Sequence, residues 1–304
     1  FLNIDKYFDF FEIDQYELNK KWLLFKKDLI HACDQLENSC INFDKDKELF
    51  SSNESNTLEK ISSIANGLVS GFDKAFICND DLNSKLNNQE KKYLVSIVKS
   101  KHLIKYKFIN YQKYILLNDA NVKNFKKEFP NFYYHFKQFK FKLLNRYDYK
   151  NGINYWDWSF LRSYKLQKSN KKKICIPCKL RIKSYEDINF SLVDEKYLLT
   201  QDVTSIFVNK ETKEDIKYIL GFLNCSVVKK WIFINNNNRG NVLEFSEEPL
   251  KNIPLRLIDW KNKSEIKIYD KIIYYVDKNL DEYDVKNSKA IDLLVNDLLN
   301  IKMD

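Results

Sequence analysis

Hydrophobic residues recur along this chain with two different periods, which divide it into helical and extended stretches. Apolar side chains spaced three or four residues apart predict an amphipathic helix over 14–38. The same spacing predicts helices over 129–147 and 213–234, and two helices within 262–302 that break near Asp281–Lys289. Pro130 suits the first turn of its helix, where a missing N–H costs no hydrogen bond.

The stretches between these helices alternate apolar and polar residues or carry turn residues. Alternation predicts strands over 105–118, with a hairpin turn near Asn110 as one option, over 171–185 and over 195–209. Residues 61–78 predict two short strands around a tight turn at Ser70 and Gly71, and 92–100 fits a helix or a buried strand. Loops are expected over 42–60 and 151–164, and a short final strand after 241. The fold class predicted is α+β.

The order of elements predicts a mixed strand-and-helix domain with flanking N- and C-terminal helices. We expect an N-terminal helix and linker over 1–60, the central domain over 61–257, and a C-terminal helical segment over 258–304. The first residue is Phe, which suggests a piece of a longer protein or a mature product. No apolar run is long enough to span a bilayer and no signal-peptide pattern opens the chain, so we expect no membrane association and a cytoplasmic location.

Charge changes this picture more than hydropathy does. The net charge of the 304 residues is +9, but the basic residues are concentrated in one block. Residues 91–183 hold 24 Lys and Arg against four Asp and Glu, whereas 1–60 and 257–304 carry an acidic excess. A lysine-rich codon bias would raise the lysine content everywhere, and the acidic ends of the chain show that it does not. The basic block therefore indicates a polyanionic partner, with nucleic acid the first choice.

Chemistry-bearing motifs are few. Six cysteines at irregular spacing do not form a disulfide framework, and the single C-x-x-C at 175–178 is half a zinc site, so we expect cysteines packed in a strand and no bound metal. Asp202 with Glu211, and Asp259 with Glu265, imitate the carboxylate pairs of metal-dependent nucleases. Such pairs arise readily by chance in a chain with 31% charged residues, and we expect no catalytic residue here.

Six short motifs, in order, carry a resemblance to a known family. The segment "ISSIANGLVSGFDKAFIC" resembles a pattern of the C-terminal specificity domain of TaqI-type adenine DNA methyltransferases and of fused Eco57I-type restriction-modification enzymes. Ser70 and Asp73 replace the Thr and Asn of that pattern. The other five motifs are "FPNFYYHFKQFKFKLLNR", "YWDWSFLRSY", "KKKICIPCKLR", "YLLTQDVTSIFV" with "DIKYILGFLNCSVVKKWI", and "LKNIPL". The resemblance covers about residues 15–257.

The resemblance implies a target-recognition domain that binds double-stranded DNA beside a methyltransferase catalytic domain, in cis or in trans. The catalytic domain of such an enzyme flips the target adenine and binds S-adenosylmethionine. This chain has no base-methylation motif and no glycine-rich cofactor loop, so we expect no cofactor in it. Gly67 and Gly71 would allow a tight turn to approach DNA or the partner domain, or would serve a structural turn that needs positive φ.

Candidate DNA contacts follow from side-chain chemistry. Lysines suit phosphates, Arg reads guanine with two hydrogen bonds, and Asn or Gln reads adenine. The candidates are Ser70, Gly71, Asp73, Lys74, Arg146, Arg162, Lys165, Lys179, Arg181, Asn236, Asn238, Arg239 and Asn241. Some of these candidates have structural alternatives. The loop "NNNNRGN" at 235–241, which holds the last four, could end a helix. Arg146 could pair internally with Asp148 or Asp157.

Three other functions remain open at this point. The chain could be half of a type I DNA-specificity subunit, whose terminal helices would act as spacers between partner proteins. It could be a metal-dependent nuclease that uses one of the two carboxylate pairs, or a protein-interaction module. DNA cleavage that is lost on Asp202→Ala or Asp259→Ala would indicate the nuclease, and failure to bind any duplex would indicate the interaction module.

Overall fold

The computed structural model describes residues 27–40, 56–147, 149, 152–169, 171–236, 238–239 and 242–301. Its helices are α1 (Lys27–Ser39), α2 (Leu58–Ile61), α3 (Asp73–Phe76), α4 (Asp80–Lys85), α5 (Asn88–Lys91), α6 (Phe125–Glu128), α7 (Pro130–Leu144), α8 (Tyr164–Gln167), α9 (Ile216–Leu223), α10 (Ser226–Asn235), α11 (Glu247–Lys251), α12 (Lys263–Asp281) and α13 (Val285–Leu298). Short 3-10 turns occupy Ser100–His102 and Tyr185–Asp187.

The strands are β1 (Ser62–Asn66), β2 (Leu94–Val98), β3 (Tyr106–Lys107), β4 (Gln112–Ile115), β5 (Lys173–Pro177), β6 (Lys179–Arg181), β7 (Ser191–Val193), β8 (Leu198–Leu199), β9 (Val203–Val208), β10 (Asn238–Arg239) and β11 (Val242–Glu244). They form three sheets with strand orders β1-β9-β5-β7-β3, β10-β11-β6 and β4-β2-β8. Parallel and antiparallel pairs coexist, which confirms the predicted α+β class.

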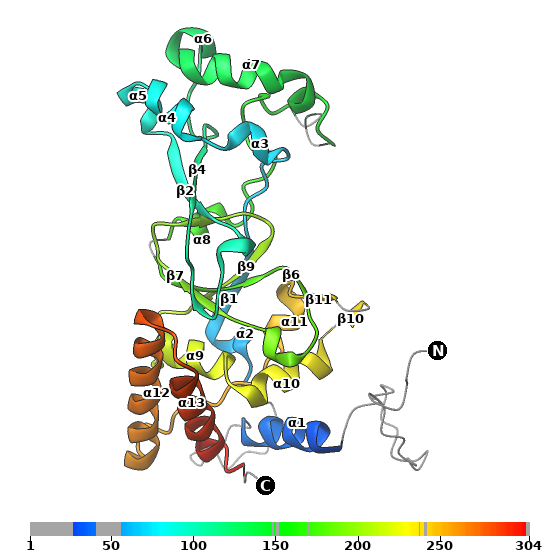
Figure 1. Ribbon diagram of the computed structural model, residues 1–304, viewed down its shortest axis with the longest axis vertical. Helices are drawn as coiled ribbons and strands as arrows, with labels where there is room; N and C mark the ends of the chain where they lie inside the picture. The colour runs from blue at the N-terminus through cyan, green and yellow to red at the C-terminus, as the bar shows by residue number, and fades with distance from the viewer. Residues whose placement is uncertain are drawn as a thin grey trace.

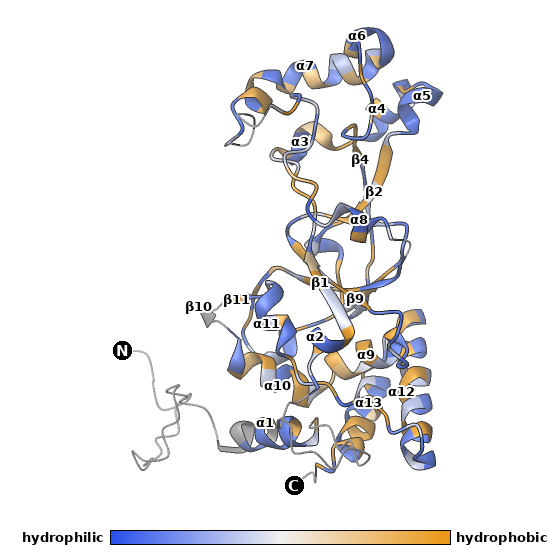
Figure 2. Ribbon diagram, turned by 180° about the vertical axis from the view of Figure 1, so that it is seen from behind, coloured by the Kyte–Doolittle hydropathy of each residue, from blue (hydrophilic) through white to orange (hydrophobic). Residues whose placement is uncertain are grey.

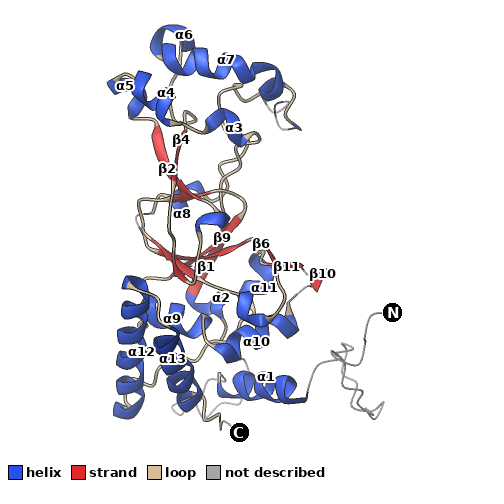
Figure 3. Cartoon of the chain, in the orientation of Figure 1, coloured by secondary structure: helices blue, strands red, loops and turns tan. Residues whose placement is uncertain are grey.

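The molecule is elongated, with strands in its middle and helices at both ends (Figures 1 and 3). The five-stranded sheet is the centre, where antiparallel β1, β9 and β5 pair along most of their length. Side chains alternate across these strands, so one set of residues faces the lower helices and the other faces the upper part. Ile174, Ile176 and Ile206 belong to the lower core, while Cys175 and Val203 belong to a small cluster above it.

The upper end is built on aromatic residues. Phe76, Phe132, Phe136 and Trp158 are almost completely buried there, and Phe76 packs edge-on against Phe136 with ring centroids 5.3 Å apart. Figure 2 shows that β2, which leads into this end, is hydrophobic, while the neighbouring α5 is hydrophilic. The upper end therefore has a core of its own, separate from the lower one.

The terminal helices share the lower core with the central region. Leu36 of α1, Tyr218 of α9 and Ile291 of α13 belong to one cluster of buried residues. Trp231 Nε1 also donates a hydrogen bond of 2.6 Å to the Glu37 carboxylate and so joins α10 to α1. The flanking helices thus pack onto the body, while the domain boundaries near 60 and 257 stay a prediction.

Several predicted elements are confirmed, although some of their limits change. The helix over 129–147 is α7, with Pro130 as its first residue, and the C-terminal pair is α12 and α13. The ambiguous stretch over 92–100 contains strand β2. The N-terminal helix starts at Lys27 in the described residues, and 14–26 lie outside them, as does most of the loop over 42–60.

Four predicted elements differ from the structure. The second strand expected within 61–78 is the short helix α3, and the hairpin at Asn110 does not form because β3 pairs with β7 and β4 with β2. The strand over 171–185 divides at Cys178 into β5 and β6, which belong to different sheets. The helix over 213–234 is divided into α9 and α10. The Asn224 side chain, between them, exchanges hydrogen bonds with the backbone of Phe190. The Asp292 carboxylate accepts a hydrogen bond of 2.7 Å from the Ser226 N–H and so starts α10.

Candidate nucleic-acid interface

The turn that follows β1 is held by contacts within the chain. Gly71 has φ of +77°, the left-handed conformation that favours glycine. Ser70 is buried, and its hydroxyl donates a hydrogen bond to the Asp73 carboxylate, which also pairs with Lys99. Burial alone would lower the pKa of Lys99, but the hydrogen bond and charge of Asp73 outweigh burial and raise that pKa, so Lys99 remains a cation.

Gly67, four residues earlier, lies directly against the backbone of Leu199 and Thr200. A Cβ built on Gly67 would lie 2.3 Å from the Thr200 carbonyl oxygen and 2.5 Å from that of Leu199. The neighbouring Leu68 N–H donates to the Leu199 carbonyl at 2.8 Å. The close approach expected at this glycine is therefore to the chain's own backbone.

Arg146 ties the turn to the end of α7 and to the aromatic loop. Its side chain is 7% exposed, and its Nη1 donates to the carbonyls of Ser70 at 2.8 Å and Asp157 at 2.9 Å. Its Nε donates to the Leu143 carbonyl at 3.0 Å, and the guanidinium lies 5.8 Å from the centroid of the Phe76 ring. The predicted internal role is thus found through backbone carbonyls, that of Asp157 among them, while Asp148 lies outside the described residues.

The remaining predicted contacts near this turn are exposed. Lys74, Arg162 and Lys165 all reach the surface, and the Arg162 guanidinium lies over the Phe160 ring at 5.6 Å. Burial of Ser70 and Arg146 corrects the expectation that these two side chains contact DNA directly. They position the turn, and the exposed cations around it are the side chains that can meet a partner.

A second group of predicted residues lies on the sheet β10-β11-β6. Lys179 and Arg181 of β6 are exposed, whereas Leu180 between them packs against the lower core. Leu243, opposite Leu180 in β11, is completely buried. Because side chains alternate across a strand, the sheet has one apolar face on the core and one outer face that carries the basic residues.

The register of this sheet brings together residues far apart in the sequence. Arg181 pairs with Val242 and Val242 pairs with Arg239, so the two arginines occupy one row across the sheet. Asn238 holds the next position of β10. Asn236 ends α10 as its C-cap, as the structural alternative expected, and Asn241 lies outside the described residues.

Exposed lysines extend this basic character over the upper end of the molecule. In Figure 1, β10 and the C-terminal end of α7 lie on the same side of the long axis. Among the described residues of the basic block, the exposed lysines are Lys91, Lys92, Lys101, Lys113, Lys123, Lys126, Lys127, Lys137, Lys140, Lys142, Lys165, Lys168, Lys172, Lys179 and Lys183.

The three described acids of the basic block have partners within the fold, and the fourth, Asp148, lies outside the described residues. Asp119 pairs with Lys168 at 2.9 Å, Glu128 accepts from the backbone of Asn124, and Asp157 accepts from Asn154. Hydrogen bonds from Lys168 and Tyr164 lower the pKa of Asp119, while burial raises the pKa of Asp157. The four acids of the block stand against 24 Lys and Arg, so they offset little of its positive field.

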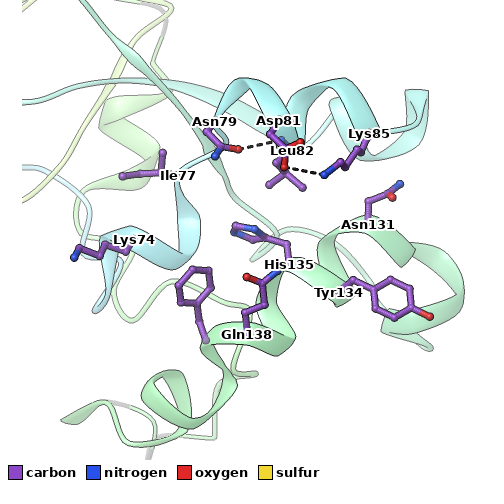
Figure 4. Close-up of a pocket in the computed structure, with 11 residues that line it drawn as sticks. Lys74, Ile77, Asn79, Asp81, Leu82, Lys85, Asn131, Tyr134, His135 and Gln138 are labelled. Atoms are coloured by element: carbon purple, nitrogen blue, oxygen red, sulfur yellow. Dashed lines mark hydrogen bonds and ion pairs between the residues drawn. The ribbon is translucent and has the colours of Figure 1, made fainter.

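A pocket of about 420 Å³ lies between α3, α4 and α7 (Figure 4). Most of its polar groups are engaged within the fold. The Asn79 side chain caps α4, Asp81 pairs with Lys85 at 2.8 Å, and the Asn131 amide donates to Glu90 at 2.7 Å. His135 bonds the Ala75 carbonyl at 2.9 Å, and burial lowers its pKa, so this ring is a structural group.

One carboxylate of each pair in the nuclease alternative is also engaged within the fold. Asp202 accepts hydrogen bonds from Ser100 and Thr200; burial raises the pKa of Asp202, but these hydrogen bonds outweigh burial and hold it below its ordinary value. Glu265 pairs with Arg256 at 2.9 Å. Within the described residues, no three His, Cys, Asp or Glu side chains gather where they could hold a metal ion.

Sequence reasoning missed the basic residues on the outer side of α7. Lys137, Lys140 and Lys142 are all exposed, but none of them is among the candidate DNA contacts. They flank Phe141, which is 80% exposed and therefore departs from the apolar periodicity that otherwise describes this helix. An aromatic residue out of register among lysines was the signal available in the sequence.

Comparison with known proteins decides the family. No protein-family model matches the chain. The type II methyltransferase M.MjaIV of Methanocaldococcus jannaschii is 35% identical over 249 residues, which cover 80% of this chain and 80% of that protein. The chain belongs to the type II methyltransferase family. The type II methyltransferase M.HindII of Haemophilus influenzae is 41% identical over 273 residues, 88% of this chain.

This type II methyltransferase chain spans 52% of the length of M.HindII, about half of that relative. Its fold is also found in a solved structure, the type IIL restriction-modification enzyme MmeI in complex with DNA, with a TM-score of 0.60. The matched region covers 85% of this chain and 35% of MmeI at 12% identity, which indicates a shared fold. No helix among the described residues is both long and apolar enough to cross a membrane.

Proposed function

We propose that this chain is the part of a type II methyltransferase that recognises a specific sequence in double-stranded DNA. The methyl group would be transferred to an adenine by a catalytic domain, in cis or in trans, that also binds S-adenosylmethionine. The resemblance to the specificity domains of TaqI-type and Eco57I-type enzymes supports this role and the adenine target. A place within bacterial restriction-modification or related phage defence follows from the same resemblance.

The observation that carries the proposal is the exposed basic surface of residues 91–183. Lysines whose charges are not balanced by nearby acids attract the phosphate backbone without regard to sequence. Sequence reading needs side chains with fixed hydrogen-bonding geometry. Arg181, exposed on the outer face of the sheet β10-β11-β6, is such a side chain, and Arg239 occupies the same row of the register.

Arg181 tests this assignment directly. We expect Arg181→Ala to weaken binding of the chain to its preferred duplex about tenfold and to relax one position of the sequence preference, because a bidentate contact to guanine is lost. The measurement is fluorescence anisotropy with a labelled duplex at several salt concentrations.

The matched control is Lys271→Ala, an exposed cation on α12 outside the proposed surface. This control should leave both affinity and preference unchanged. Equal losses in the two variants would mean that only total charge matters, and the proposed reading surface would be incorrect.

A further inference from the structure

Helix α7 presents two opposite faces. Phe132, Phe136 and Leu143 are completely buried in the upper core. Residues 134, 138, 141 and 145 are spaced four, three and four apart, so they form one stripe along the other side of the helix. That stripe reads Tyr, Gln, Phe and Asn, and all four residues are exposed.

Aromatic side chains on and next to the stripe are largely exposed to solvent. Tyr134 is 57% exposed and Phe141 is 80% exposed, and Tyr147, just beyond the helix, is 93% exposed. Single exposed aromatics are ordinary on protein surfaces. Two on one face of a helix, Tyr134 and Phe141, indicate a surface that a partner covers.

The charge around the stripe identifies the kind of partner. Residues 129–147 contain the exposed Lys137, Lys140 and Lys142 and no Asp or Glu. The Lys142 ammonium lies 5.5 Å from the centroid of the Phe72 ring, and the Lys140 ammonium lies 5.3 Å from that of the Tyr155 ring. These two cations lie beside aromatic faces, and three exposed lysines with no acid on the helix favour a partner that carries negative charge.

Gln138 lies on the stripe between Tyr134 and Phe141, at the rim of the pocket in Figure 4. It is exposed, and none of the hydrogen bonds described for this structure uses its amide. A glutamine amide matches the N6 and N7 edge of adenine in the major groove, and an apolar ring matches the methyl group of thymine. Amide and aromatic groups flanked by lysines favour duplex DNA over an acidic protein.

Resting on the proposed function, we infer that the stripe of α7 enters the major groove and reads base pairs there. The 15 residues of α7 form a rod about 22 Å long, and the major groove, about 12 Å wide, admits an α-helix. Gln138 would read adenine, Phe141 would contact a thymine methyl group, and Lys137, Lys140 and Lys142 would contact phosphates. This adds a second reading surface to the sheet β10-β11-β6.

The test compares variants of the whole chain on the duplex that the unmodified chain selects from a random pool. Gln138→Ala should relax one adenine position of the selected motif, and Phe141→Ala should weaken binding about tenfold. Replacing that adenine by 7-deazaadenine removes the N7 acceptor. It should weaken binding of the unmodified chain about fivefold or more and leave Gln138→Ala unaffected.

Tyr274→Ala is the matched control, because Tyr274 is 54% exposed on α12 and carries the same kind of side chain. It should keep both motif and affinity. If the unmodified chain selects a motif while Gln138→Ala and Phe141→Ala select the same motif with equal affinity, the major-groove role of α7 is refuted and the proposed function stands. If the unmodified chain selects no motif, both fail.

Discussion

Replacing Arg146 by alanine is expected to lower the free energy of unfolding by about 3–5 kcal/mol, in the range seen when a buried charged group is removed from its partners. The variant leaves the carbonyls of Ser70, Leu143 and Asp157 without the donor that now satisfies them. It also leaves a cavity beside the Phe76 ring. Urea denaturation followed by tryptophan fluorescence measures the loss, since Trp158 is buried in the same core.

Two companion variants separate this explanation from a general effect of charge. Arg146→Lys should recover only part of the loss, because an ammonium cannot reproduce the planar fork that serves several carbonyls. Arg162→Ala removes an exposed arginine nearby and should change the free energy of unfolding by less than about 0.5 kcal/mol. A loss below about 1 kcal/mol for Arg146→Ala would show that the turn does not depend on this guanidinium.

Gly67→Ala is expected to cost about 3 kcal/mol or more, at the upper end for overpacking. The added methyl group would meet two backbone carbonyl oxygens, at 2.3 and 2.5 Å, and backbone atoms cannot rotate away as a flexible side chain does. Relief requires β1 to move away from the segment that joins β8 to β9. The same denaturation experiment measures the effect.

Gly152 provides the matched control for this substitution. Nothing lies within 4 Å of a Cβ built there, although its φ of +75° is left-handed. Gly152→Ala should therefore cost only about 1–2 kcal/mol, from the backbone conformation alone. Equal effects at the two glycines would mean that the close approach at Gly67 is not what requires glycine.

Sequence patterns were sufficient to predict those elements that depend only on residues close together in the sequence. Helix α7 follows from Pro130 and from apolar residues at helical spacing, and both are visible in the sequence. The break between α9 and α10 could not be predicted in this way, because the carboxylate that starts α10 belongs to Asp292, 66 residues later. The hairpin at Asn110 failed for a related reason: β3 and β4 find their partners in different sheets.

The candidate interface shows the same division. The excess of basic residues in 91–183 is a property of the sequence, and it predicted a polyanionic partner. An internal role for Arg146 was one predicted alternative, but its contact with the Ser70 carbonyl was not predictable, because that contact joins residues 76 apart. The row that Arg181 shares with Arg239 likewise exists only once β6 and β10 flank β11.

The measurement that tests the central claim most directly is selection of duplexes from a randomised pool by the purified chain, followed by binding across a range of salt concentrations. The account predicts an enriched sequence motif, with an affinity that falls steeply as salt rises, because phosphate contacts release counterions. Binding without enrichment, or no binding at low salt, would contradict the claim that this chain itself recognises DNA sequence.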